Sequence, residues 1–506
     1  MEKTRTYAVI GAGPVGYVLS ILLALKGYNV ELFEKRSNPL TTLQSDEWRS
    51  TNFLLLCRAF PAFRKVGVLD EVLKYSAKVD KLKIVLSDLD EFELNYRGKG
   101  PEDVAFSLNR KELQKVLAKR IQKFQDKIKI QYNATILNVQ IEKSSFDVKH
   151  QDGNVEIKSG YDMIFGTDGI HSAVQQAFQQ LAGFSFQREY NGYGYTELQI
   201  PALESQEGNK FRVQEKTFFH WPRKELDTHM WGMPNYNGDI NIGLILKIAG
   251  ENSFEYFKTS GFQEFQKFLF EHFPDTRYLM PNLKDLYDKC QLTRIQTMKC
   301  GPWRFGNFML VGDSSHCQNP FGGLGFNGNM EECSLIDDLI DKHQCNWNLI
   351  GEEFYAKRKP IADKMNEYGD TQFAIFKYKL FEEPIQISMI IQDYMSRYYG
   401  DIFQTVSQLI RYQDKDFIEC LNYGPVQSKI FNELKKEIPN FLDVVRTGKF
   451  DQRVYDILAK YKDITDLRQI EIYSKSQADK AQSAGKTQEN LFSKYLPSYH
   501  KNKPRL

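Results

Sequence analysis

The sequence predicts an α/β fold with a Rossmann-type domain, an inserted β-sheet domain and a helical C-terminal region. Three observations predict this fold. A glycine-rich turn lies between a short apolar strand and an apolar helix at residues 7–26. Segments that alternate as strands do lie between about 185 and 295, and a helical pattern rich in Phe and Tyr runs from 328 to about 470.

The first turn contains Gly11, Gly13 and Gly16, and the strand that follows its helix ends on Glu34. This order of strand, glycine turn, helix, strand and acid is typical of a dinucleotide-binding βαβ unit. The first glycine permits the turn, the second admits a pyrophosphate, and the third lets the helix pack closely. The helix N-terminus favours the phosphate charge, and Glu34 can accept hydrogen bonds from a ribose. The motif therefore predicts a bound adenine dinucleotide.

Two later turns carry the same kind of signal. Asp168 and Gly169 follow an apolar strand at 161–165, where they can approach a pyrophosphate, although an ordinary turn is the alternative. Asp313 follows the apolar strand that begins at 308 and can accept hydrogen bonds from ribose or ribityl hydroxyls. The glycine-rich segment 320–327 then lets the backbone approach a planar ring. A helix that begins near Gly328 places its positive end where a reduced flavin carries negative charge.

These patterns divide the chain into five parts. We expect a Rossmann-type part at 1–180, a β-rich substrate domain at 185–295, a return to the first domain at 296–345, a helical region at 346–470, and a polar, partly disordered tail at 471–506. Within the tail, residues 474–490 contain no aromatic and no large aliphatic residue.

Composition excludes several classes of function. The chain of 506 residues is 42% hydrophobic and 26% charged, with a formal net charge of +2, which gives no electrostatic support for nucleic-acid binding. The seven cysteines are scattered without a CxxC pair, so we expect neither disulfides nor a metal site, and a reducing compartment. No signal peptide and no apolar run of about 18 residues is found, so we expect no transmembrane anchor.

The three turns, in this order, resemble those of the single-component FAD-dependent aromatic monooxygenases of the para-hydroxybenzoate hydroxylase type. Within that family, shorter blocks are similar to those of kynurenine 3-monooxygenases. These blocks lie at 49–52, 107–110, 194–201, 220–223, 233–235, 272–275, 299–303 and 358–360.

The resemblance implies FAD as cofactor, NAD(P)H as a transient reductant, and hydroxylation of an electron-rich aromatic ring. It assigns no catalytic side chain. It implies that Gly11, Gly13, Val15, Gly16, Glu34 and Arg36 hold the ADP half of FAD, that Arg49, Asn52 and Arg110 flank the cofactor, that Asp168 and Gly169 lie near it, and that Asp313, Gly325, Phe326 and Asn327 hold its flavin end. For Arg110, a surface ion pair is the alternative.

The positions that bind the substrate carboxylate in this family are substituted here. An arginine is replaced by Lys83, an asparagine by Gln372, and a second tyrosine by Phe403 or its neighbour Ile402, while Tyr96 matches the first tyrosine. Lysine offers a point charge in place of a bidentate fork. Loss of these contacts weakens binding by roughly 10- to 1000-fold. An accessory or structural subunit with little hydroxylase activity is therefore the alternative function, and a non-oxygenase FAD oxidoreductase is a third.

The resemblance also implies a kynurenine-like aromatic substrate, possible protein assembly partners, and either association with mitochondria or a cytoplasmic location. Four further features have structural interpretations. We expect His316 to cap or pack near the cofactor, and the aromatic segment 368–381 to pack as a buried helix. Trp221 and Trp231 can line the substrate site or belong to the core.

Overall fold

The computed structural model describes residues 4–41, 51–87, 90–98, 100, 103–203, 210–412 and 415–463. The chain divides into two compact units, Met1–Phe417 and Ile418–Leu506. Arg49 and the segment 474–490 lie outside the described residues.

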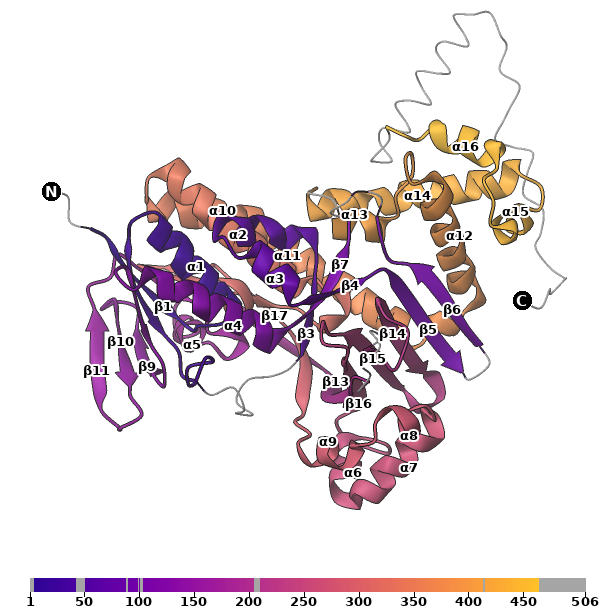
Figure 1. Cartoon of the computed structure of the whole chain (residues 1–506). Helices are drawn as coiled ribbons and strands as arrows, with labels where there is room; N and C mark the ends of the chain where they lie inside the picture. Colours follow the sequence, from indigo (N-terminus) through magenta and orange to yellow (C-terminus); the bar gives the residue numbers. More distant parts are fainter. Residues whose placement is uncertain are drawn as a thin grey trace, which may run out of the picture. The chain divides into compact units, whose positions relative to one another are not determined.

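A six-stranded, mainly parallel sheet forms the centre of the first unit, in the order β18-β19-β12-β1-β2-β8 (Figure 1). Its strands are β1 (Thr6–Ile10), β2 (Asn29–Phe33), β8 (Ile128–Gln131), β12 (Met163–Gly166), β19 (Phe308–Leu310) and the antiparallel edge strand β18 (Arg304–Phe305). Because β12 pairs in parallel with β1, and β19 in parallel with β12, segments about 150 and 300 residues apart end at the same edge of the sheet. The predicted Rossmann-type sheet is confirmed.

Helices cover this sheet. Every residue of α1 (Pro14–Leu25) except the last is buried, because the helix packs between the sheet and its neighbours α4 (Arg110–Ile121) and α10 (Gly325–His343). The helix α10 begins at Gly325, three residues before the position that the sequence indicates. The turn that precedes this helix ends at Gly323, whose φ of +64° lies in the left-handed region that favours glycine.

An eight-stranded sheet forms the second layer of the unit, in the order β20-β17-β13-β16-β15-β14-β5-β6. Its strands are β20 (His316–Cys317), β17 (Thr293–Gly301), β13 (Ser185–Ile200), β16 (Ile240–Lys247), β15 (Thr228–Pro234), β14 (Thr217–Arg223), β5 (Lys81–Ser87) and β6 (Asp90–Asn95). The predicted strands at 194–200 and 240–246 pair as neighbours. Two strands from the first 180 residues, β5 and β6, also join this sheet, which the sequence did not indicate.

The two faces of the eight-stranded sheet have different neighbours. On one face, Phe219, Trp221 and Met230 pack with a cluster of four helices below β13 and β16 (Figure 1). These helices are α6 (Phe254–Ser260), α7 (Phe262–His272), α8 (Thr276–Leu279) and α9 (Leu283–Asp288). On the other face, α11 (Trp347–Lys377) places Phe376 against His220. Trp221 is therefore a core residue, whereas Trp231 lies on the face that α11 covers.

The remaining elements are smaller. They are the sheet of β3 (Asn52–Leu55), β4 (Ser76–Val79) and β7 (Ala105–Asn109), the sheet of β9 (Thr135–Gln140), β10 (Ser145–Lys149) and β11 (Val155–Ser159), and the helices α2 (Phe60–Lys65), α3 (Leu69–Lys74), α5 (Ala173–Phe178), α12 (Glu383–Tyr399), α13 (Val406–Tyr412), α14 (Phe417–Glu437), α15 (Phe441–Thr447) and α16 (Gln452–Ala459).

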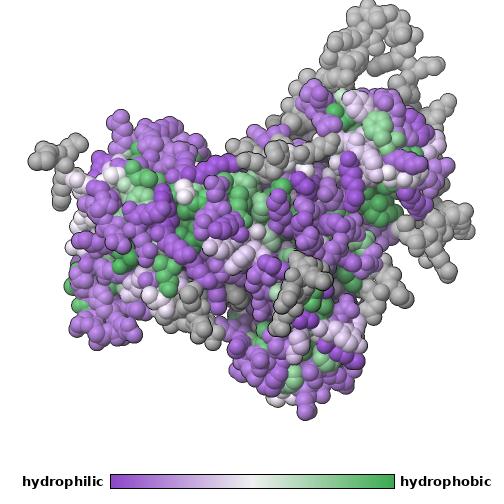
Figure 2. Space-filling model, viewed as in Figure 1, coloured by the Kyte–Doolittle hydropathy of each residue, from purple (hydrophilic) through white to green (hydrophobic). Residues whose placement is uncertain are grey.

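Hydrophilic residues cover most of the face that Figure 2 shows, with smaller hydrophobic patches between them. Of the helices in the described part of the chain, none combines the length and the apolar character that a membrane crossing requires.

Candidate active site

The three predicted turns converge at the carboxyl ends of β1, β12 and β19. The backbone N–H of Thr167 donates to Ile10 O at 2.8 Å, and its hydroxyl donates to Gly11 O at 2.8 Å. The N–H of Val311 donates to Gly166 O at 3.0 Å. Ligands of open α/β sheets bind at this kind of edge. The structure therefore assembles one composite site from segments far apart in the sequence.

The first turn leaves space where a pyrophosphate is expected. A Cβ on Gly16 would lie 1.9 Å from Gly11 O, and a Cβ on Gly11, whose φ is +99°, would lie 2.7 Å from Asp168 Cα. A Cβ on Gly13 would meet nothing within 4 Å. No side chain caps the N-terminus of α1. Two glycines are thus required by packing, and the third borders open space beside uncapped N–H groups, which fits a phosphate.

Glu34 is held rigidly at the end of β2. Its carboxylate accepts hydrogen bonds from the backbone N–H groups of Ala12 at 2.8 Å and Arg36 at 2.9 Å. The guanidinium of Arg36 lies 3.5 Å from the same carboxylate. Glu34 is 3% exposed, so its orientation toward the turn is fixed. Val15 packs between the first and third turns, because its methyl group lies 2.9 Å from the Cβ position of Gly312.

Asp168 combines a bound and a free carboxylate oxygen. Its Oδ2 accepts the N–H of Ala173 at the start of α5 at 2.7 Å, while its buried Oδ1 accepts no hydrogen bond from the described residues. Burial raises the pKa of Asp168 to about 6. The adjacent Gly169 has a φ of +77° and open space at its Cβ position. An acceptor without a donor beside open space fits a hydroxyl of the cofactor.

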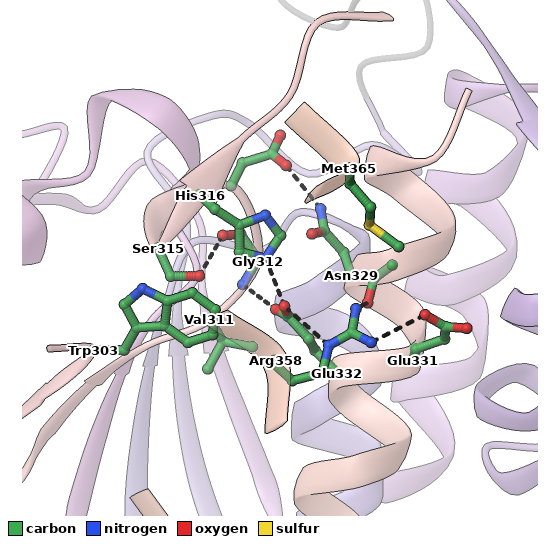
Figure 3. Close-up of polar contacts among 12 residues, drawn as sticks. Trp303, Val311, Gly312, Ser315, His316, Asn329, Glu331, Glu332, Arg358 and Met365 are labelled. Atoms are coloured by element: carbon green, nitrogen blue, oxygen red, sulfur yellow. Dashed lines mark hydrogen bonds and ion pairs between the residues drawn. The ribbon is translucent and has the colours of Figure 1, made fainter. Parts of the chain in front are cut away.

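A buried charged network holds the third turn (Figure 3). Glu332 is fully buried and accepts the N–H of Gly312 at 3.0 Å. Its other oxygen lies 2.5 Å from Nε2 of His316 and 3.5 Å from Nε of Arg358. Burial opposes the charge of Glu332, but the charge and hydrogen bond of His316 outweigh it and lower the pKa of the carboxyl. His316 is thus the partner of Glu332 behind the turn.

The turn itself presents Asp313, whose Oδ1 accepts a hydrogen bond from the amide of Asn329 at 2.8 Å. At the start of α10, Asn327 accepts the N–H of Leu56 at 2.9 Å and donates to Leu54 O at 2.7 Å, which ties the helix to β3. Phe326 stacks on Phe53 with centroids 4.2 Å apart.

Of the residues predicted to flank the cofactor, Asn52 begins β3, and Arg110 begins α4 directly after the neighbouring strand β7. The guanidinium of Arg110 lies 5.6 Å from the ring centroid of Phe53. Asn52 donates to Ser107 at 2.7 Å and to Asn235 at 2.8 Å, so it joins β3 to the end of β15. Gly325 is the first residue of α10.

An aromatic cluster lies between the glycine-rich turn, the eight-stranded sheet and α11. Its members are Phe218, His220, His229 and Trp231 from the sheet, Phe321 from the turn, and Phe373 and Phe376 from α11. The ring of Phe321 lies 6.1 Å from His229, 6.0 Å from Trp231 and 4.6 Å from Phe373. The cluster therefore adjoins the turn that was predicted to hold the flavin end.

Two neutral histidines lie at the centre of this cluster. Nδ1 of His220 is 2.7 Å from Nε2 of His229, and Phe376 stacks on His220 with centroids 4.2 Å apart. Burial lowers the pKa of His229 to about 3. Burial, the neighbouring His229 and the charge of Arg411 lower the pKa of His220 well below its usual value. The outer nitrogens, Nε2 of His220 and Nδ1 of His229, are buried without a partner among the described residues.

The four predicted substrate residues are not all brought to this cluster. Lys83 pairs with Phe219 across β5 and β14, so it lies on the opposite face of the sheet, where its ammonium is 2.7 Å from Glu91. Tyr96 is buried and its ring lies 6.2 Å from Phe218. Phe403 is buried between α12 and α13.

Gln372 lies on the face of α11 that is turned toward the cluster. It lies one turn from Tyr368 and one turn from Phe376, so the three side chains share one face of the helix. Phe376 stacks on His220, which directs this face toward the sheet.

Sequence reasoning did not identify His229 or Glu332 as site residues. Alternation along β15 could have placed His229 and Trp231 on one face. Glu332 meets His316, Gly312 and Arg358 only through tertiary packing, and no local pattern marks it.

A family model described as an FAD binding domain matches residues 3–340. The chain belongs to this family of FAD-binding proteins. It is 26% identical over 465 residues to the kynurenine 3-monooxygenase of Christiangramia forsetii, covering 91% of this chain and 100% of the relative. It is 28% identical over 459 residues to that of Myxococcus xanthus, covering 88% and 94%.

Solved structures share the fold. A 2-methyl-3-hydroxypyridine-5-carboxylic acid oxygenase superimposes with a TM-score of 0.59 at 19% identity, covering 79% of this chain and 97% of that chain. PqsL of Pseudomonas aeruginosa, in complex with 2-aminobenzoylacetate, has a TM-score of 0.56 at 16% identity, with coverages of 75% and 98%.

These comparisons confirm the predicted cofactor and class. The chain is an FAD-dependent monooxygenase of a family whose usual reductant is NAD(P)H. The named kynurenine 3-monooxygenases are bacterial, so they give no support to the expected association with mitochondria.

Proposed function

We propose that this FAD-binding protein hydroxylates a kynurenine-like aromatic substrate in the aromatic cluster, next to the flavin end of the cofactor. One observation carries this proposal. The turn that follows Asp313 is also the element whose Phe321 packs against His229, Trp231 and Phe373. The elements proposed to hold the cofactor and the substrate ring therefore share one turn. The kynurenine 3-monooxygenase relatives, which span most of the chain, support the substrate class.

The residues of the composite site fit FAD. Gly13 borders the space for the pyrophosphate, and Glu34 is oriented for a ribose. The buried Oδ1 of Asp168 accepts no hydrogen bond from the residues that the structure describes. When bound, FAD supplies the two-electron chemistry that passes reducing equivalents from NAD(P)H to dioxygen. The chain supplies the binding surface, the orientation of the substrate and the exclusion of water.

The aromatic cluster supplies a largely buried surface of aromatic rings. Stacked and edge-on rings favour an aromatic guest through dispersion and quadrupole contacts. The two unpartnered histidine nitrogens can exchange hydrogen bonds with an amino or carbonyl group on the substrate ring, and a buried group without a partner is costly to leave so. Because both histidines remain neutral, they can hold a neutral polar group without adding charge.

The test uses the full chain loaded with FAD. We expect kynurenine to accelerate oxidation of NADPH or NADH and to yield a product heavier by one oxygen atom, detected by mass spectrometry. No response to aromatic compounds would contradict the proposal and favour the accessory role. Rapid oxidation of NAD(P)H without a hydroxylated product would also contradict it and favour a non-oxygenase FAD oxidoreductase.

A matched pair of variants locates the site. Phe376→Ala removes a ring that stacks on His220, whereas Phe268→Ala removes a buried ring on the opposite face of the sheet. Both lose similar core volume. We expect only Phe376→Ala to lower the yield of hydroxylated product per NAD(P)H. An equal loss in both variants would place the substrate elsewhere.

A further inference from the structure

Arg411, near the end of α13, lies beside the aromatic cluster in an unusual setting. Its guanidinium carbon is 4.1 Å from the ring centroid of Tyr96. Tyr368 and Tyr412 are close enough to act on its charge, and its own charge acts on His220. Burial would lower the pKa of Arg411, but the three tyrosines outweigh burial and raise it. The guanidinium therefore keeps its charge.

No carboxylate offsets this charge among the residues that the structure describes. Two arginines that are more deeply buried, Arg58 and Arg358, both have an acidic partner. Arg58 lies 2.7 Å from Glu331, and Arg358 lies 3.2 Å from the same residue. Arg411 is half-buried, and burying a cation even in part without an acidic partner costs free energy. The cost is understandable where the missing partner is an anionic ligand.

Tyr368 connects Arg411 to the proposed substrate site. Its ring lies 3.4 Å from the Cβ position of Gly322, in the turn that also carries Phe321. One turn further along α11 lies Gln372, and one turn beyond it Phe376 stacks on His220. The helix face thus runs from the cation past an amide to the aromatic rings. A ligand with an anionic group at one end and an aromatic ring at the other matches this order.

Lys83 cannot supply this cation from its position. It lies on the other face of the sheet, its ammonium is paired with Glu91 at 2.7 Å, and its side chain remains 24% exposed. The sheet itself therefore lies between the side chain of Lys83 and the cluster.

We propose that Arg411 is the residue that binds the anionic group of the substrate, in place of Lys83, with Tyr96, Tyr368 and Gln372 around that group. This inference rests on the proposed function, because it assumes that the aromatic cluster holds the substrate ring. Arg411 would then make the site selective for aromatic carboxylates over uncharged aromatic compounds.

Binding to the FAD-loaded full chain tests this role, measured by the change in flavin absorbance. The ligands are kynurenine and its carboxamide, which differ only in the anionic group. We expect Arg411→Gln to weaken kynurenine binding roughly 10- to 150-fold, since hydrogen bonds to charged groups contribute about 1.5–3 kcal/mol. Binding of the carboxamide should change less than about twofold, and Lys83→Gln should leave the preference for the acid intact.

Arg411→Lys controls for folding, because it keeps the charge but not the fork, and it should recover part of the preference. The inference is overturned if Arg411→Gln weakens both ligands equally, if Lys83→Gln removes the preference, or if the parent chain binds the carboxamide as well as the acid.

The outcomes also separate this inference from the proposed function. Hydroxylation of both ligands without a preference for the acid would support the function and refute the role of Arg411. Binding of the acid that depends on Arg411, without hydroxylation, would support the role and refute the function. Failure of both ligands to bind would refute both.

Discussion

At the scale of single residues, the site contains ionisable groups whose pKa values are shifted by burial and by their neighbours. Asp168 is the clearest case, because burial raises the pKa of its carboxyl to about 6, and one of its oxygens has no donor within the described part of the chain. The folded state then binds a proton more tightly than the unfolded state does. Between about pH 4 and pH 6, the free energy of unfolding falls as pH rises, the reverse of the usual behaviour of an acid.

Asp168→Asn should remove this dependence. We compare the free energies of unfolding of FAD-free variant and parent at pH 4.5 and at pH 7.5. The variant should become more stable relative to the parent by roughly 1–3 kcal/mol at the higher pH, because a pKa shift of one unit corresponds to about 1.4 kcal/mol. Urea unfolding at the two pH values measures the change. The exposed Asp152 provides the control, since Asp152→Asn should leave the difference unchanged. Equal pH dependence in the parent and Asp168→Asn would contradict this account.

Two Glu–His pairs allow a second comparison at this scale. Glu332 and His316 are both almost fully buried, at 0% and 2% exposure, whereas Glu353 and His343 form a partly exposed pair at 2.7 Å. Glu332→Gln should cost about 3–5 kcal/mol of unfolding free energy, and Glu353→Gln should cost much less, because solvent screens its ion pairs. Because Glu332 also accepts the N–H of Gly312, its loss should weaken FAD binding as well.

Chemical denaturation and fluorescence titration with FAD measure these two effects. The folded-state pKa of Glu332 is lowered, so its stabilising contribution exists above the pKa of the unfolded state and is lost as pH falls through the folded pKa. The difference between the parent and Glu332→Gln should therefore shrink in acid. A constant difference down to low pH would indicate that packing, and not charge, is responsible.

At the scale of elements, the turn between β1 and α1 separates a packing role from a binding role. Gly16→Ala should destabilise the protein, because the new Cβ would lie 1.9 Å from the backbone oxygen of Gly11. Gly13→Ala should leave the melting temperature of FAD-free protein nearly unchanged, because its Cβ would meet nothing within 4 Å. It should nevertheless weaken FAD binding about tenfold or more, since it fills the space for the pyrophosphate.

Thermal unfolding with and without FAD distinguishes the two variants, because a ligand that binds the native state raises its melting temperature. Full stabilisation of Gly13→Ala by FAD would place the pyrophosphate away from this turn.

The elements also show what the sequence could predict. The strand, turn and helix around Gly13 are encoded within a short window, so their pattern predicts both structure and cofactor. The side of the sheet on which Lys83 lies depends on the register between β5 and β14, which are about 130 residues apart. A slip by one residue would reverse the face, and no local signal fixes that register. Arg411 lies on a helix of seven residues, and the sequence pattern of that helix does not predict that Arg411 lies near Tyr96 or Tyr368.

At the scale of the whole molecule, every described residue assigned to the cofactor or the substrate belongs to the unit Met1–Phe417. The large parallel sheet, the eight-stranded sheet and α11 all lie within it. The helix α14 begins at Phe417, whose ring is 5.9 Å from that of Tyr368. A chain that ends after Phe417 therefore keeps the aromatic contact next to the proposed anion site.

We expect this shortened chain to bind FAD with a dissociation constant within about threefold of that of the full chain, because independent parts of a protein contribute additively. Fluorescence titration of FAD into both chains measures this, with circular dichroism to verify folding. A chain that ends after Met395, inside α12, is the matched control, since it also lacks Arg411 and Phe403. That control should lose kynurenine binding. A folded chain ending at Phe417 that fails to bind FAD would show that residues after 417 contribute to the cofactor site.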